Sequence, residues 1–111
     1  MRRFKDTYGR QIRLTNERQE HIKADHPEMS GQIDKIESTL LNPDIIVKSR
    51  ADPQVELFYR YYKATLVEEK YLCVVVKELI DDLFVITAYL TDTVKGGKIL
   101  WERKLFIRLW H

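Results

Sequence analysis

The apolar residues of this chain change from helical to strand-like spacing close to Asp44. Over the residues that lead up to this point, about 17–41, they recur every three or four residues, as along one face of a helix. After it they alternate or form short continuous runs, as in strands. A segment with one of these periods cannot bury its apolar side chains in the other kind of element. This change predicts an α+β fold in which helices precede a sheet.

Two helices are expected in the first part of the chain. Thr15–Asn16 offers an N-cap for a helix over about residues 17–25. Pro27 disfavours helical geometry at the residue before it, which places His26 at the end of this helix. A second helix ends at Asn42–Pro43. For packing on one face of a sheet, the two helices offer Ile22, Ile33, Ile36 and Leu40.

Five segments have the period of strands, the first of them a short edge strand ahead of the helices: residues 10–14, 45–48, 55–62, 71–77 and 84–90. The turns between the later strands are too short for a crossover helix, so neighbouring strands should run antiparallel. A length of 111 residues excludes two independent cores. We therefore predict one domain over residues 1–111, an α+β fold with two N-terminal helices packed on a four- to five-stranded antiparallel sheet.

The last predicted strand has two chemically different faces. Alternation places Thr87, Tyr89 and Thr91 on one face, opposite Phe84, Ile86, Ala88 and Leu90. Lys77 shares the hydroxyl-bearing face if the intervening turn keeps the apolar sets together. Arg60 and Tyr62 end another strand. Aromatic and cationic side chains on an open sheet suit base stacking and phosphate contacts, although strands favour tyrosine and threonine in any case.

The C-terminal segment, residues 93–111, is basic. It carries five Lys and Arg residues against Glu102, whereas the whole chain has a net charge of +2. Such a segment favours a polyanion such as RNA, or it is simply a solvated surface. Residues 99–110 have the pattern of a helix or of a strand packed on the core. The alternatives are docking to a protein inhibitor, in a homodimer, or on a membrane surface.

Several classes of protein are excluded by what the sequence lacks. No apolar run approaches the roughly 20 residues of a membrane span. The single cysteine, Cys73, cannot form an internal disulfide, which favours a reducing compartment and a cytoplasmic location. Phosphate-loop and serine-nucleophile motifs are absent, and His21 and His26 lack the spacing of zinc ligands on a helix. No metal or cofactor is expected.

His26 is the first candidate for acid–base chemistry. The tripeptide His26-Pro27-Glu28 lies at a predicted helix end, where an imidazole can reach a substrate. Histidine is the side chain whose charge changes near neutral pH. The alternative is a histidine that only caps the helix at the surface.

An ordered series of short motifs resembles small bacterial and phage-associated domains of the barnase/EndoU/colicin/RelE-like nuclease superfamily. The resemblance covers about residues 8–101. It consists of Leu14-Thr15-x-Glu17-Arg18-x-x-His21-Ile22, His26-Pro27-Glu28, Asn42-Pro43-Asp44, Tyr61-Tyr62, Tyr71-Leu-x-Val-Val-Val-Lys77, Phe84-Val-Ile-Thr-Ala-Tyr89 and Thr91-Asp92.

The resemblance implies a metal-independent ribonuclease, often a toxin, in which the RNA 2′-hydroxyl attacks the adjacent phosphate. Such chemistry needs a base, an acid and charge stabilisation around the phosphate. By resemblance, His26 would be the acid–base residue and Arg60 or Lys77 would stabilise phosphate charge. Thr87 and Tyr89 would position the phosphate or relay a proton. Substrate binding would involve Arg60, Tyr62 and His21.

Two other classes of function stay open. One is a non-catalytic module that binds RNA or protein through the tyrosine-rich sheet and the basic tail. The other is an interaction domain that docks through residues 99–110, with Trp101 and Trp110 at its ends.

Overall fold

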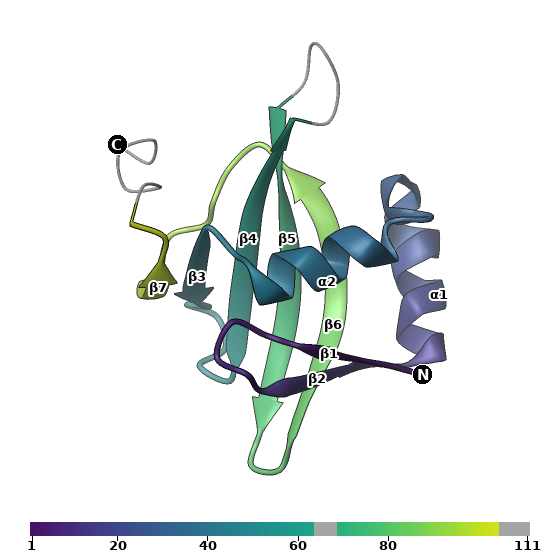
Figure 1. Cartoon of the computed structure of the whole chain (residues 1–111), viewed down its shortest axis with the longest axis horizontal. Helices are drawn as coiled ribbons and strands as arrows, with labels where there is room; N and C mark the ends of the chain where they lie inside the picture. Colours follow the sequence, from purple (N-terminus) through teal and green to yellow (C-terminus); the bar gives the residue numbers. More distant parts are fainter. Residues whose placement is uncertain (64–68, 105–111) are drawn as a thin grey trace.

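The computed structural model describes residues 1–63 and 69–104. In this part of the chain it contains one seven-stranded sheet, in the order β1-β2-β6-β5-β4-β3-β7, two α-helices and a 3₁₀ turn (Figure 1). The elements are β1 (Arg2–Lys5), β2 (Gln11–Leu14), α1 (Asn16–Asp25), η1 (Pro27–Met29), α2 (Ile33–Leu41), β3 (Ile45–Lys48), β4 (Val55–Lys63), β5 (Glu69–Leu79), β6 (Asp82–Thr91) and β7 (Lys98–Glu102).

The boundaries of α1 follow from local chemistry, as predicted. The Thr15 hydroxyl accepts a hydrogen bond from the Arg18 N–H at 3.1 Å, so Thr15 is the N-cap. At the other end His26 is the C-cap, because Pro27 begins η1 directly after it. The predicted position of His26 at a helix end is confirmed.

The predicted sheet was too small and of the wrong type. β3, β4, β5 and β6 pair antiparallel as expected, but β2 runs parallel to β6 through Arg13 opposite Phe84. The sheet is therefore mixed. The helices are not N-terminal, because the β1–β2 hairpin precedes them, and the predicted edge strand lies between β1 and β6. In β1, Phe4 is buried among three exposed cations, a pattern too short to reveal a strand.

The sheet packs apolar side chains on both of its faces. On the first face the helices contribute Ile22, Ile36 and Leu40, with Ile33 packed at the margin, which confirms the predicted packing residues. Figure 1 shows α2 crossing the middle strands and α1 lying beside β6. The second face carries a smaller cluster, built around Ile45, Val47, Val55, Leu57, Tyr59 and Cys73. The first face therefore holds the main core of the domain.

A bulge changes the predicted faces of β6. The register between β5 and β6 shifts so that Val76 pairs with Val85 while Val75 pairs with Thr87, and Ile86 is the extra residue. Ala88 lies in the first core, as predicted, but Ile86 packs with Tyr89 on the second face. The prediction that Ile86 faces away from Tyr89 is therefore wrong.

The described part of the predicted tail is a strand. β7 pairs antiparallel with β3, and Trp101 packs against the first core. The rest of that segment, with Trp110, lies outside the described residues, so docking through residues 99–110 stays a prediction. In residues 1–63 and 69–104 no helix is long and apolar enough to cross a membrane.

Candidate active site

The backbone holds His26 at the junction of α1 and η1. Its N–H donates to the Ile22 carbonyl at 2.7 Å, and its own carbonyl accepts from the Met29 N–H at 2.9 Å. Ile22 and Met29 are both buried in the first core. The backbone of His26 is therefore tied to the core through two buried neighbours.

The junction lies against the second half of β6. β2 contacts β6 near Phe84, and beyond that point the described residues place α1 and η1, rather than a strand, beside β6. The backbone N–H of Leu90 donates to Glu28 Oε2 at 3.4 Å. A side chain of η1 thus takes the place of a strand partner at this edge.

Three side chains meet here: His26, Glu28 and Tyr89. The rings of His26 and Tyr89 have centroids 5.4 Å apart and are tilted by 33°. His26 Nδ1 lies 3.7 Å from Glu28 Oε2, and the two side chains are 33% and 37% exposed. The imidazole is therefore half-buried between an aromatic ring and a carboxylate, with an accessible side for a substrate.

Tyr89 packs against the cluster on the second face of the sheet, next to Cys73. Burial raises the pKa of Tyr89, and the neighbouring Cys73 raises it further. Burial also raises the pKa of the Cys73 thiol to about 11, against the effect of hydrogen bonds with Tyr89 and Tyr59. The Tyr59 hydroxyl accepts from the Lys95 N–H at 3.1 Å. Tyr89 therefore keeps its proton at neutral pH and acts as a neutral group.

The other residues predicted on the hydroxyl-bearing face, Thr87 and Lys77, are spread along the strands. Thr87 lies two residues before Tyr89 and pairs with Val75. Lys77 shares the face, as predicted, but pairs with Phe84 and forms an ion pair with Asp52 at 2.6 Å. It is four residues along β5 from the partner of Tyr89, or about 13 Å. Lys77 is thus separated from His26, and its catalytic role stays a prediction.

His21 is separated from His26 as well. It is exposed on α1, with its Nε2 3.7 Å from the Glu17 carboxylate. The structure brings neither Tyr89 nor Glu28 to it. Its role in substrate binding stays a prediction.

Arg60 and Tyr62 lie on the first face of the sheet, which the helices cover, at the same end of the sheet as His26. Arg60 pairs with Leu72, which in turn pairs with Leu90, so two strand spacings of about 4.8 Å separate Arg60 from the strand beside Glu28. The Arg60 guanidinium lies 5.5 Å from the centre of the Tyr62 ring and donates to the Asn42 carbonyl at 2.6 Å.

Lys35 completes this group and was not predicted. Its Nζ lies 5.4 Å from the centre of the Tyr62 ring, so two cations contact one aromatic ring. We call Lys35, Arg60 and Tyr62 the basic patch. The sequence could place Lys35 in the second helix, but it could not predict the contact of Lys35 with Tyr62, a strand residue 27 positions later.

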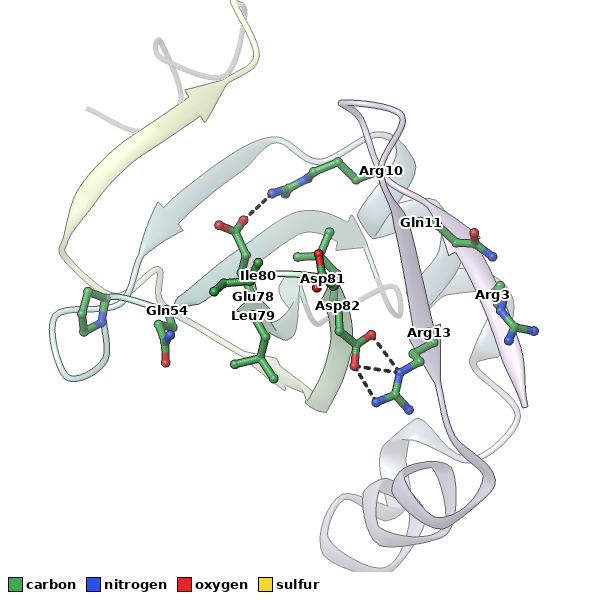
Figure 2. Close-up of a pocket in the computed structure, with 12 residues that line it drawn as sticks. Arg3, Arg10, Gln11, Arg13, Gln54, Glu78, Leu79, Ile80, Asp81 and Asp82 are labelled. Carbon is green, nitrogen blue, oxygen red and sulfur yellow. Dashed lines mark hydrogen bonds and ion pairs between the residues drawn. The ribbon is translucent and has the colours of Figure 1, made fainter.

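A pocket of about 680 Å³ lies elsewhere, between the β1–β2 hairpin and the β5–β6 turn (Figure 2). Two of the arginines that line it, Arg10 and Arg13, already have carboxylate partners within the protein. Arg13 makes a fork to Asp82 with contacts of 2.7 to 3.1 Å, and Arg10 contacts Asp6, Glu56 and Glu78. Its lining includes neither described histidine. We therefore place the candidate active site at His26.

Metal ligands are not grouped in the part of the chain that the structure describes. There, no three His, Cys, Asp or Glu side chains lie together in a way that could hold a metal ion.

Comparison with protein families places the chain among the phage-associated nuclease-like domains. It belongs to the PBECR2 family, described as phage-Barnase-EndoU-ColicinE5/D-RelE like nuclease2, whose model matches residues 1–106. No match was found among curated proteins or among solved structures. The family match covers both helices and all seven strands described above.

Proposed function

We propose that this domain is a metal-independent ribonuclease with His26 as its acid–base residue. The observation that carries the proposal is the position of His26: a half-buried imidazole between Tyr89 and Glu28, in a chain of a nuclease-like family. A general base must combine access to the substrate with a fixed orientation. Of the two histidines in the described residues, His26 has both properties and His21 is exposed on α1.

In the proposed reaction, His26 takes the proton of an RNA 2′-hydroxyl. The 2′-oxygen forms a bond to the adjacent phosphorus and the bond from phosphorus to the 5′-oxygen breaks. The leaving 5′-oxygen takes a proton from water, and the imidazolium returns its proton to solvent. The products are a 2′,3′-cyclic phosphate and a 5′-hydroxyl.

Tyr89 and Thr87 have supporting roles in this proposal. The Tyr89 ring packs beside the imidazole, and its neutral hydroxyl adds no negative charge near the phosphate. We assign the Thr87 hydroxyl a role in positioning the phosphate, because Thr87 lies on the same face of β6 as Tyr89.

The basic patch supports a second candidate function, binding of RNA without cleavage. Lys35 and Arg60, which lie 5.4 and 5.5 Å from the centre of the Tyr62 ring, combine cations for phosphates with a ring for a base. Binding of this kind weakens steeply with salt, because cations on RNA are released.

The test is a cleavage assay on total cellular RNA in the presence of a chelator. We expect 2′,3′-cyclic phosphate ends from the parent protein and a loss of at least about a hundredfold in rate with His26→Ala. His21→Ala is the matched control, because it removes an exposed imidazole from the same helix. Equal cleavage by His26→Ala and the parent would refute the assignment. Salt-sensitive binding without cleavage by the parent would favour the second function.

A further inference from the structure

We propose that Glu28 is a positioning residue that fixes which nitrogen of His26 faces the substrate. This inference rests on the proposed function, because it deepens the role of His26. The sequence pointed to His26 but assigned Glu28 no part of its own. The structure places the Glu28 carboxylate between the imidazole and the β6 backbone.

One oxygen of Glu28 makes both contacts. Oε2 lies 3.4 Å from the Leu90 backbone nitrogen and 3.7 Å from His26 Nδ1. Leu90 follows Tyr89 directly, so the carboxylate is anchored to the strand that carries the aromatic neighbour of His26. The ring is thereby oriented relative to β6 rather than to α1 alone.

This arrangement decides the tautomer of the neutral imidazole. A carboxylate facing Nδ1 favours the proton on that nitrogen and leaves the lone pair on Nε2. Nε2 can then accept the 2′-hydroxyl proton. Hydrogen bonds in an unliganded site are often long and shorten when substrate binds, so 3.7 Å is compatible with this role.

The groups that contact His26 come from two elements, Glu28 from η1 and Tyr89 from β6. On α1 the preceding residue, Asp25, is exposed. In the described part of the chain, Glu28 makes the one ion pair recorded for His26. Glu28 is therefore the group with the geometry to choose the tautomer.

A purely structural role for Glu28 is the competing explanation. In that case the carboxylate only satisfies the Leu90 N–H at the edge of the sheet. Two variants separate the two roles. Glu28→Gln keeps an oxygen acceptor for Leu90 but loses the charge beside Nδ1, whereas Glu28→Ala loses both.

The first readout is independent of activity. Long-range nitrogen–proton NMR spectra of the neutral imidazoles, recorded at alkaline pH, report the tautomer of each histidine. We expect His26 to carry its proton on Nδ1 in the parent and to shift toward Nε2 in Glu28→Ala, with a smaller shift in Glu28→Gln. The matched control is Glu17→Gln, since Glu17 lies at the same 3.7 Å from exposed His21. It should leave the His26 signals unchanged.

The second readout is cleavage. We expect Glu28→Gln to lower kcat by about tenfold to a hundredfold with little change in KM, because a misoriented base slows the chemical step. A His26 tautomer unchanged in both Glu28 variants would overturn the inference, even if RNA is cleaved. If His26→Ala still cleaves RNA, the proposed function fails, while the tautomer measurement still decides whether Glu28 orients His26.

Discussion

Replacing Ile22 with alanine tests how α1 holds His26 in place. Ile22 is the residue that α1 buries in the first core, with 3% of its surface exposed, and its carbonyl accepts the His26 N–H. The change removes three carbons from the core, worth about 2.4 kcal/mol at about 0.8 kcal/mol for each buried carbon group. Incomplete collapse of the cavity adds to this, so we expect a loss of about 3 kcal/mol in the free energy of unfolding.

The assay is urea denaturation followed by circular dichroism, with the slope of the transition as a check on two-state behaviour. The matched control is Ile80→Ala, because Ile80 is fully exposed at the β5–β6 turn. That control should change the free energy of unfolding by less than about 0.5 kcal/mol. Equal losses in the two variants, or a loss below about 1 kcal/mol for Ile22→Ala, would refute the argument that burial of Ile22 attaches α1 to the sheet.

Two further predictions concern the rest of the fold. Gly97→Ala would bring a Cβ into a steric clash with the Lys48 carbonyl, and we expect denaturation to show a loss of about 1–3 kcal/mol in the free energy of unfolding. Gly96→Ala, which meets the end of a flexible side chain, should cost less, and the reverse order would refute the reasoning. The hydrogen bond from Lys77 lowers the pKa of Asp52. This pair therefore stabilises the fold at pH values above the unfolded-state pKa of the carboxyl. The stabilisation is lost as the pH falls through the lower pKa of the folded state. The stability difference between the parent and Lys77→Met should therefore shrink on acidification below about pH 4, and a gap that stays constant to pH 2 would contradict this.

The helices and the central strands could be predicted because their signals are local. Apolar spacing over ten or so residues distinguishes a helix from a strand, and the pyrrolidine ring of Pro27 disfavours helical geometry at the residue before it. The same local chemistry placed His26 at a helix end, which is why the main candidate residue could be found in the sequence. Short turns between successive strands were enough to predict the antiparallel pairing from β3 to β6.

The hairpin and its pairing could not be predicted in this way. β1 has four residues, of which one is buried, so its period is too short to recognise. The parallel contact of β2 with β6 joins Arg13 to Phe84, across most of the chain. The β6 bulge inserts Ile86 and reverses the face of the strand before it, an event that alternation alone cannot reveal.

The residues around His26 also divide into those whose position the sequence could predict and those whose position it could not. The sequence by itself determined that a histidine would stand at the end of α1, since this depends on a proline one residue away. Only the tertiary structure decided that Tyr89 and the Leu90 backbone would lie beside this histidine and Glu28. It also decided that Lys77 would pair with Asp52 at a distance from the site. The contact of Lys35 with the ring of Tyr62, next to Arg60, is a tertiary contact as well. Local sterics act between neighbours in the chain, whereas these contacts depend on strand register and on which edge of the sheet a helix covers, and many residues together set both.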